Sequence, residues 1–418
     1  MKSNYKLLGD YITRVDVRNK NLETTNLKGL SMTKEFRDST SNIVGVDLSK
    51  YKLVPKNHFA CDFMSVIRVH KLPVVHQNSD DLIIVSPAYT VFKVIDETIL
   101  NPEYLMMWFR RPEFDRYADF RCDSAIRGGF KWEELGEVEL PIPSIEKQRD
   151  IVKEYNTIVN RIKLNETLNQ KLEDTAQALY KHWFVDFNFP NANGKPYKSS
   201  GGKMVYNEEL DMEIPEGWEV LPISDFCDVT FSKRIYQSEY SKSGIPFYRS
   251  KEIILKKNGK KITNELYIPE TRFKEITDKF GTISEGDILL TAVGTIGVSY
   301  LVTKKDNFYF KDGNLFWFKN FKNNGFNKLI YQWMQTKYFE ESLAEITFGS
   351  TQKVITTTAV YLLKHINPNK ELLHLFKLYS ESILRKKENK INENSLLREL
   401  KDLLLSKMSK VETKTFVV

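Results

Sequence analysis

Two long segments with helical periodicity constrain the fold of this chain most strongly. The first runs from about Ser144 to Phe184, and the second from about Lys370 to Val411. In both, apolar residues recur at alternating spacings of four and three, which is typical of helices that pack along one seam. About 40 helical residues span roughly 60 Å at 1.5 Å per residue. The sequence therefore predicts two helices that are longer than one globular domain needs.

The predicted seams have apolar ends and polar centres. The first seam is Ile151, Tyr155, Ile158, Ile162, Asn165, Asn169, Leu172, Ala176, Leu179 and Trp183; the second is Leu372, Phe376, Tyr379, Ile383, Lys386, Lys390, Glu393, Leu397, Leu400 and Leu404. We interpret Asn165 and Asn169 as polar seam residues that fix the register of the helices. The alternative is that they face a partner protein. Trp183 and Phe184 are expected in a hydrophobic core.

The segments around the helices also repeat. Leu168, Leu172 and Asp174 lie 228 positions before Leu396, Leu400 and Asp402. Residues 5–12 resemble residues 218–226, residues 81–85 resemble residues 287–291, and Pro143 and Pro368 precede the two helices. The order module, helix, module, helix indicates that a whole domain has been duplicated.

The 418 residues therefore divide into modules 1–143 and 190–368 and helical segments 144–189 and 369–418, with 190–213 as a linker or exposed excursion. Each module has mixed α and β character. Residues 286–297 predict strand, turn and strand, and Lys311–Asn314 predicts a hairpin turn. Residues 327–344 predict a short helix, with 101–110 as its counterpart. The predicted fold class is α+β, with pseudo-twofold duplicated domains separated by two long antiparallel helices.

Charge and cysteine content narrow the function classes. The net charge is +7, but residues 1–190 carry 27 basic and 27 acidic side chains and sum to zero. If DNA is the partner, local clusters must attract it. Three widely spaced cysteines without C-x-x-C argue against structural zinc and a disulfide framework. The first twelve residues have no apolar core, and no apolar run could span a membrane, so we expect a cytoplasmic protein with no membrane partner.

Catalytic motifs are hard to find. The sequence has no Walker A lysine motif, no G-x-G-x-x-G and no G-x-S-x-G, and its six histidines lack metal-ligand spacing. Residues 86–89, Ser-Pro-Ala-Tyr, resemble the loop with which amino-methyltransferases hold a flipped base, although alanine replaces the second proline. No glycine-rich cofactor loop precedes them. We interpret them as a strand break, and Gly294–Gly297 as a turn.

Several loops in both modules mix basic, polar and aromatic residues, which can position phosphates and read base edges. The predicted DNA-binding residues are Arg14, Arg18, Lys20, Lys34, Arg127, Lys131, Lys233, Arg234, Tyr236, Arg249, Lys251, Lys257, Lys260, Ser350, Thr351, Gln352 and Lys353. A single cluster of this kind is usually a solvated loop. The recurrence in both modules strengthens the case for nucleic acid.

The chain resembles the specificity subunit of type I restriction–modification systems over nearly its whole length. The matching motifs are residues 140–152 (Leu-Pro-Ile-Pro-Ser-Ile-Glu-Lys-Gln-Arg-Asp-Ile-Val), 214–218, 286–290, 293–297 and 348–352. Two departures stand out. Residues 366–371 lack the Gln-Arg pair, which puts the start of the second helix in doubt. Module one also lacks a G-D-x-L copy.

The resemblance implies a non-catalytic subunit for host defence, whose modules are target-recognition domains that each read half of a bipartite site. The helices would pair antiparallel, set the spacing and dock two methyltransferase subunits, and restriction–translocation subunits would join. No cofactor would bind this chain, because S-adenosylmethionine would bind the methyltransferase. Two alternatives stay open: a self-contained N6-adenine DNA methyltransferase that uses residues 86–89, and a scaffold with no nucleic-acid role.

Overall fold

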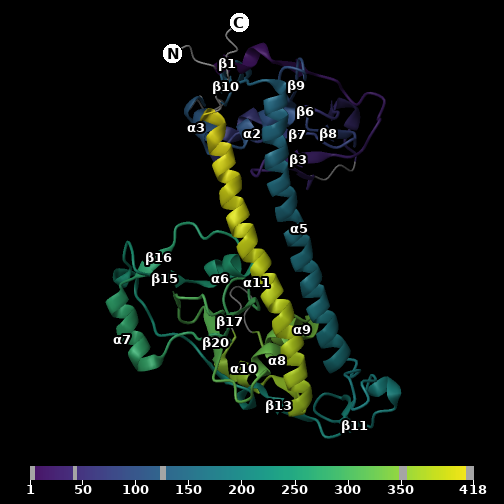
Figure 1. Cartoon of the computed structure of the whole chain (residues 1–418), viewed down its shortest axis with the longest axis vertical. Coiled ribbons are helices and arrows are strands. Elements are labelled where there is room, and N and C mark those ends of the chain that lie inside the picture. Colours follow the sequence, from purple (N-terminus) through teal and green to yellow (C-terminus); the bar gives the residue numbers. More distant parts are fainter. Residues whose placement is uncertain (1–4, 41–44, 123–128, 348–354, 411–418) are drawn as a thin grey trace. The chain divides into compact units, whose positions relative to one another are not determined.

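The computed structural model describes residues 5–40, 45–122, 129–347 and 355–410. The chain forms two compact units. One combines Met1–Lys163 with Leu396–Val418, and the other is Leu164–Ser395. Each unit therefore holds one module together with parts of both long helices (Figure 1). Hereafter, the module of the first unit is the first domain and that of the second unit is the second domain.

Both predicted long helices are present. Helix α5 covers Ile145–Phe184 and helix α11 covers Lys370–Lys407. Ser144 caps α5, because its Oγ accepts a hydrogen bond from the Lys147 amide at 3.3 Å. Asn369 caps α11 in the same way, with its Oδ1 2.9 Å from the Leu372 amide. The matching caps place the start of α11 where Pro368 predicts it, although the Gln-Arg pair is missing.

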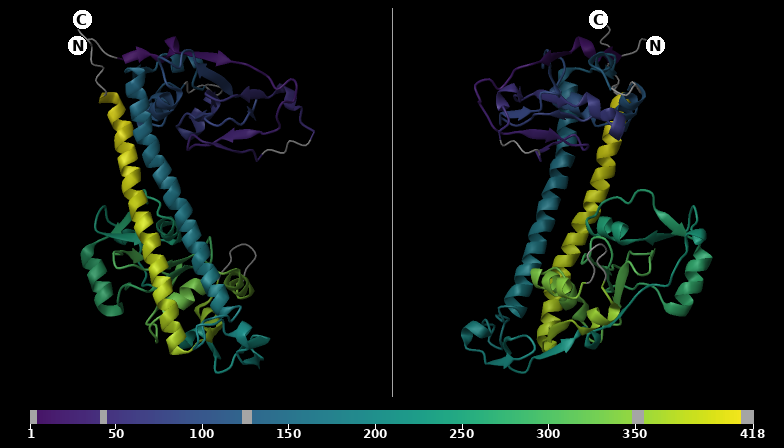
Figure 2. Two further views of the ribbon diagram at one scale, coloured as in Figure 1. Left: turned by 45° about the vertical axis from the view of Figure 1, so that its right-hand side comes forward. Right: turned by 180° about the vertical axis from the view of Figure 1, so that it is seen from behind.

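The two helices run antiparallel in the second unit (Figures 1 and 2). Asn165 Nδ2 donates to Asn394 Oδ1 at 2.9 Å, while the Trp183 ring lies 5.9 Å from that of Phe376. Residue numbers therefore increase along α5 in the same direction in which they decrease along α11. Trp183 and Phe184 are buried in the core of this unit, as predicted.

The predicted seam of α11 is right at its start, where Leu372 and Phe376 are buried, and is wrong further along the helix. Tyr379 and Leu400 are exposed, whereas Ser380, Asn394 and Leu405 are buried. The prediction followed the apolar side chains, but the buried face of α11 includes polar residues, of which Asn394 accepts a hydrogen bond from Asn165 of α5. Leu396, Leu400 and Leu403 instead form an exposed stripe along the last turns of α11.

The two domains share one architecture. In the first, β1 (Tyr5–Leu7) pairs with β10 (Glu139–Pro141), and β2 (Ile12–Val15), β9 (Thr90–Val94), β6 (His58–Cys61) and β7 (Val74–His76) form an antiparallel sheet in that order. In the second, β13 (Glu219–Pro222) pairs with β21 (Lys364–Asn367), and the sheet order is β14 (Asp228–Thr230), β20 (Leu315–Lys319), β17 (Ile288–Thr291) and β18 (Ser299–Leu301). The duplicated layout follows from this correspondence.

Three helices follow the sheet in each domain. They are α2 (Pro102–Phe109), α3 (Pro112–Phe120) and α4 (Trp132–Gly136) in the first, and α8 (Phe326–Trp333), α9 (Lys337–Glu345) and α10 (Thr357–Leu362) in the second. The predicted helix 327–344 is thus two helices, because Thr336 caps α9 with its Oγ1 3.2 Å from the Phe339 amide. The predicted helix 101–110 is α2.

The domains differ in what is inserted between shared elements. The first adds β3 (Lys28–Leu30), β4 (Phe36–Asp38), β5 (Lys52–Val54), β8 (Ile83–Val85) and α1 (Val66–Val69). The second adds β15 (Ile245–Tyr248), α6 (Ser250–Lys257), β16 (Leu266–Ile268), α7 (Glu270–Phe280) and β19 (Tyr309–Phe310). These insertions carry most of the predicted binding clusters.

One predicted correspondence is wrong, and the structure supplies the right one. Residues 81–85 include β8, which pairs with β5, so they do not match 287–291. The counterpart of β17 is β6. Asn57 before β6 has a φ of 62° and its amide donates to Gln77 O at 2.7 Å; Gly286 before β17 has a φ of 93° and donates to Val302 O at 3.0 Å. Asparagine tolerates this left-handed conformation, so it replaces the glycine of the second copy.

One further local prediction needs correction, and a second is refined. The strands on either side of Lys311–Asn314 do not form a hairpin, because β19 pairs in parallel with β15 while β20 lies between β14 and β17. The segment 190–213 is an exposed excursion, one of its two predicted alternatives, and it is folded rather than a flexible linker. It contains β11 (Met204–Asn207), which pairs with β12 (Met212–Pro215), and the Phe189 ring stacks 5.0 Å from that of Trp218.

The predicted strand–turn–strand at 286–297 is confirmed. Strand β17 pairs antiparallel with β18, with Ile288 opposite Leu301. Gly294 and Gly297 have φ values of 78° and 87° in the turn between them. Residues 86–89 likewise form the turn between β8 and β9, as predicted, with the Tyr89 amide 3.1 Å from Ser86 O. No helix among the described residues is both long and apolar enough to cross a membrane.

The buried Asn165–Asn394 hydrogen bond should stabilise the helix pair. We expect Asn165→Ala to lower the free energy of unfolding by about 1–3 kcal/mol, because a buried polar contact and side-chain volume are both lost. Asn160→Ala, at an exposed position of α5, is the control and should change it by less than about 0.5 kcal/mol. Hydrogen–deuterium exchange of α11 peptides measures both; equal protection in the two variants would contradict the register role.

Candidate nucleic-acid interface

A groove in the second domain brings together basic, amide and aromatic side chains. It has a volume of about 690 Å³. Its polar lining is Arg234, Tyr236, Gln237, Arg249, Lys311, Asp312 and Asn314. We call it the Arg234 groove. Arginine, glutamine and asparagine are the side chains that read base edges in pairs of hydrogen bonds, so this combination suits a DNA base more than an apolar ligand.

The segment that carries Arg234 is held on both sides. Ser232 Oγ donates to Phe310 O at 2.6 Å, and the Lys233 amide donates to the Tyr309 hydroxyl at 2.8 Å. The next residue, Ile235, is buried among apolar residues from β15, β16 and α7. Arg234 itself is therefore an exposed side chain on a backbone that is fixed by packing and hydrogen bonds.

The opposite wall is the turn 311–314, which follows β19. The Lys311 amide donates to Tyr248 O at 2.9 Å, and Asn314 O accepts from the Ala292 amide at 2.8 Å. Gly313 has a φ of 67°, which favours glycine at this position. Non-local contacts thus fix this turn, although its sequence is that of a hairpin.

Two arginines of the groove are paired with carboxylates. Arg234 Nε donates to Asp312 Oδ2 at 3.0 Å, and this bond raises the pKa of the guanidinium. Arg249 donates through Nε and Nη2 to Glu252, at 3.0 and 2.8 Å. Burial opposes ionisation of Glu252, but the hydrogen bonds from Arg249 outweigh it and lower the pKa of that carboxyl. Both arginines are thus oriented before any ligand binds.

In the first domain, Arg14, Lys131 and Trp132 meet where β2 approaches the start of α4. The Arg14 guanidinium lies 4.9 Å from the centre of the Trp132 ring and 3.7 Å from Glu133. Arg18 donates to Lys50 O at 2.8 Å and to Asp16 at 3.0 Å. These side chains are compatible with a phosphate-contacting surface. The hydrogen bond from Arg18 lowers the pKa of Asp16 despite the opposing effect of desolvation.

Lys34 does not belong to this surface. Its side chain is 5% exposed, its Nζ lies 2.7 Å from Asp115 Oδ1 and it also donates to Phe109 O. Burial lowers the pKa of the ammonium, although Asp115 opposes the shift. Through these bonds, Lys34 holds the β3–β4 turn against α2 and α3. Its prediction as a DNA contact is therefore wrong.

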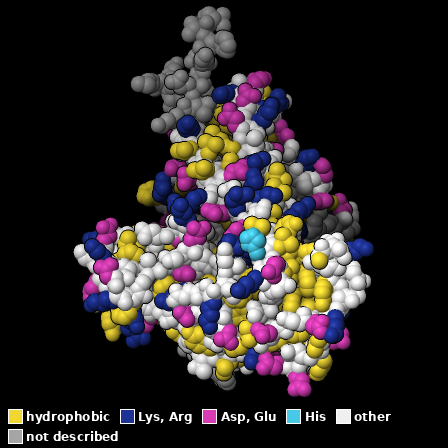
Figure 3. Space-filling model, turned by 60° about the horizontal axis from the view of Figure 1, so that its bottom comes forward, with side chains coloured by type: hydrophobic (Ala, Val, Ile, Leu, Met, Phe, Trp, Pro, Cys, Tyr) yellow, Lys and Arg dark blue, Asp and Glu magenta, His cyan; other side chains and the backbone are white. Residues whose placement is uncertain are grey.

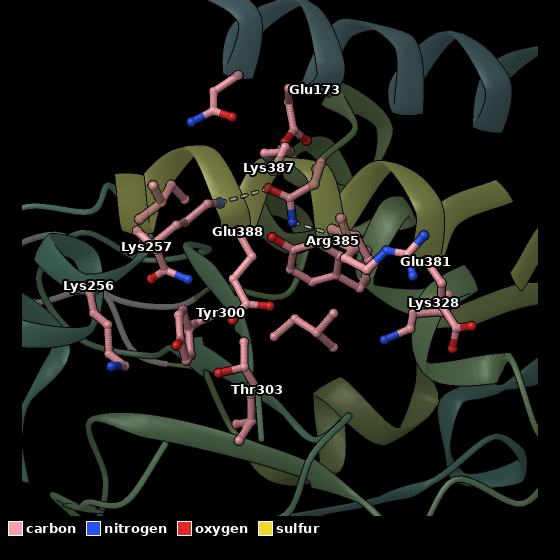
Figure 4. A pocket seen from close by; sticks show the side chains of 18 of the residues that line it. Glu173, Lys256, Lys257, Tyr300, Thr303, Lys328, Glu381, Arg385, Lys387 and Glu388 are labelled. Carbon is pink, nitrogen blue, oxygen red and sulfur yellow. Dashed lines mark hydrogen bonds and ion pairs between the residues drawn. The ribbon is translucent and has the colours of Figure 1, made fainter. Parts of the chain in front are cut away.

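Lys257 faces a second cavity and is not on the groove surface. This cavity has a volume of about 1090 Å³, and Lys256, Lys257 and Glu388 lie around it (Figure 4). Lys257 Nζ donates to Gln335 Oε1 at 2.7 Å, and burial lowers its pKa. Two ion pairs involve residues that line the same cavity. Lys256 Nζ lies 2.8 Å from Asp306 Oδ1, and Lys387 pairs with Glu173. Lys257 is therefore engaged inside the second unit and lies apart from the Arg234 groove.

The other predicted residues stay predictions. Lys20, Lys233, Lys251 and Lys260 are exposed, and the Lys233 ammonium lies 4.4 Å from the centre of the Phe280 ring. Arg127, Ser350, Thr351, Gln352 and Lys353 lie outside the described residues. Along the sequence, these two segments fall between the corresponding helix pairs α3–α4 and α9–α10.

Four polar residues of the groove lining are absent from the predicted contacts: Gln237, Lys311, Asp312 and Asn314. Gln237 begins the short 3-10 helix Gln237–Glu239, and the other three belong to the turn after β19. The sequence Lys311–Asn314 predicts a hairpin turn, and such a turn does not by itself mark its polar side chains as DNA contacts. Charge alone does not mark the site, since basic and acidic side chains are interspersed over the face in Figure 3.

Comparisons with known proteins agree with this architecture. Residues 215–397 match the family model of the type I restriction modification DNA specificity domain. Over these residues, the second domain is similar to the DNA specificity domain of type I restriction systems. The HindI specificity subunit of Haemophilus influenzae is 23% identical over 395 residues, covering 76% of this chain and 79% of that protein. The MjaIX specificity subunit of Methanocaldococcus jannaschii is 32% identical over 175 residues, covering 41% of this chain and 38% of that protein.

The fold extends the likeness beyond the matched domain. A solved type I restriction–modification S subunit from M. genitalium has a TM-score of 0.57 and 14% identity, covering 98% of this chain and 96% of that one. At that identity the likeness concerns the fold alone. It confirms the α+β class and the duplicated two-domain layout of a specificity subunit.

Removal of the Lys34 ammonium should loosen the first domain. We expect Lys34→Ala to destabilise β3 and β4 by about 3–5 kcal/mol, because it leaves Asp115 without its buried ion-pair partner. Hydrogen–deuterium exchange of peptides from residues 28–38 measures the loss. Lys20→Ala is the control, and equal protection of these peptides in both variants would show that Lys34 has no such role.

Proposed function

We propose that this chain is the non-catalytic DNA-recognition subunit of a type I restriction–modification complex, and that each domain reads one half of a bipartite site. The Arg234 groove carries the proposal, because it gathers oriented arginines, amides and a tyrosine on fixed loops. The duplicated sheet-and-helix architecture supports a second reader in the first domain. There, Arg14, Arg18, Lys20 and Lys131 are the candidate contacts.

The long helices would set the distance between the half-sites. Two readers on one duplex need a fixed separation, and a stiff helix pair maintains this better than a flexible linker. In each unit the helices pack in the domain core: Val152, Tyr155 and Leu405 lie in the first, and Tyr180, Trp183 and Phe376 in the second. A change in helix length would thus change the gap between half-sites.

The helices also offer a surface for two methyltransferase subunits. Leu396, Leu400 and Leu403 recur at spacings of four and three along α11, and their exposed fractions are 68%, 46% and 55%. An apolar stripe of this kind suits an amphipathic helix of a partner. The partner methyltransferase would bind S-adenosylmethionine and flip the target base, and restriction–translocation subunits would join the assembly in the cytoplasm.

Partner dependence tests the non-catalytic assignment. The chain, a co-expressed methyltransferase subunit and both together are incubated with S-adenosylmethionine and genomic DNA. We expect sequence-specific adenine methylation from the mixture alone, because residues 86–89 form a turn that connects β8 to β9 and no glycine-rich cofactor loop precedes them in the sequence. Methyl transfer by the purified chain alone would overturn the proposal in favour of a self-contained methyltransferase.

Lys311 tests the groove as a DNA surface. In the methyltransferase complex, Lys311→Ala should weaken binding of a cognate duplex and reduce the slope of log K against log salt by about 1, because one phosphate contact is lost. Lys337→Ala on α9, whose side chain is 86% exposed, is the control and should leave the slope unchanged. A duplex titration across salt concentrations measures both, and identical slopes for the two variants would count against the groove.

The leucine stripe tests partner docking. Leu400→Glu combined with Leu403→Glu should abolish co-purification of the methyltransferase subunit, since two carboxylates would be buried at the interface without partners. The control Leu362→Glu changes an exposed leucine of α10, which is 65% exposed and belongs to neither α5 nor α11. If both variants retain the partner at the wild-type ratio, the docking surface lies elsewhere on the chain.

A further inference from the structure

The two arginines of the Arg234 groove differ in how much of each guanidinium is already engaged. Asp312 holds Arg234 by Nε, and Arg234 keeps a side-chain exposure of 67%. Glu252 holds Arg249 by both Nε and Nη2 and also accepts from the Arg249 backbone amide at 2.9 Å. Arg249 thus has its Nε–Nη2 edge engaged by Glu252, whereas Arg234 is held by Asp312 through Nε and is the more exposed of the two side chains, at 67% against 41%.

We propose that Arg234 reads a guanine in the half-site bound by the second domain, with Asp312 as its positioning residue. This inference rests on the proposed DNA-recognition function. Guanine presents O6 and N7 as two acceptors side by side in the major groove, and the two terminal nitrogens of an arginine match them. An arginine that is oriented in advance loses less side-chain entropy when it forms these two bonds.

The neighbouring carboxylate favours a base over a phosphate as the ligand. Asp312 is 17% exposed and lies in direct contact with Arg234, so its negative charge would repel a phosphate at the same guanidinium. A guanine edge is neutral and is not repelled in this way. The Tyr236 phenol also lies beside Arg234 and raises its pKa, in the same direction as Asp312.

The fixed position of both loops supports a role in specificity. Ser232 and Lys233 are hydrogen-bonded to β19, and the turn that carries Asp312 begins directly after that strand. Arg234 and Asp312 are therefore held relative to the same strand. Arg249, at the start of α6, is by contrast a positioning residue that caps its helix through Glu252.

A randomised-site methylation assay tests the inference. The complex of this chain with its methyltransferase subunit is incubated with a duplex library in which both half-sites are randomised, and the methylated products are sequenced. Wild-type chain should select guanine at one or more positions of the second half-site. Arg234→Ala and Arg234→Lys should both lose about 5- to 150-fold of that selection at one guanine, with other positions unchanged. The lysine variant keeps the charge but lacks the two-pronged edge.

Two further variants complete the design. Asp312→Ala should weaken selection at the same guanine by less than Arg234→Ala does, while the exposed control Lys337→Ala on α9 should leave that selection in place. Unchanged selection in Arg234→Lys, or an equal loss at every position, would identify a phosphate contact and overturn the inference while the DNA-recognition function stands. If the wild-type complex shows no base selection at all, the proposed function itself fails, and the inference with it.

Discussion

Each long helix belongs to two hydrophobic cores, and the rest of the structure depends on this constraint. Helix α5 contributes Tyr155 to the core of the first unit and Trp183 to that of the second. Helix α11 contributes Phe376 to the second core and Leu405 to the first. A helix that ends inside a packed domain transmits its length and register to that domain. Each domain is thus packed against parts of both long helices.

The seam between the helices is polar at its centre, which affects both the stability of the helix pair and its register. Asn165 and Asn394 are both buried, and the Lys387–Glu173 ion pair lies along the same helices. An apolar seam would pack with greater stability but would accept several registers. Paired amides accept few alternatives, and register determines which domain face a helix presents. The polar centre therefore restricts the two helices to one register.

Local patterns predicted the long helices, the duplication and the turn at 286–297, because each depends on residues close in sequence. Predictions failed where distant residues decide the outcome. Lys34 is buried and pairs with Asp115, which lies 81 positions away in the sequence. The first-domain copy of the Gly286 motif was missed because Asn57 performs the same backbone role. The turn after β19 resembled a hairpin, but the pairing of its strands is non-local.

The candidate site shows the same limit. The sequence marks Arg234 and Arg249 equally, as basic residues among aromatics, and their different carboxylate contacts are visible only in the folded domain. Lys257 also looked like a surface charge, yet it faces a cavity along α11. Basic clusters therefore identify the region, whereas burial and pairing separate structural cations from those that remain for a ligand.

The central claim is that one kind of recognition domain is used twice on shared helices. Exchange of one module tests this claim most directly. Residues 5–143 are replaced by the corresponding domain of another family member, and the methylated motif of cells that carry the hybrid and its methyltransferase is determined by sequencing. The account predicts that one half-site changes while the other half-site and the gap are retained. A hybrid motif that changes in both halves, or in the gap, would contradict it.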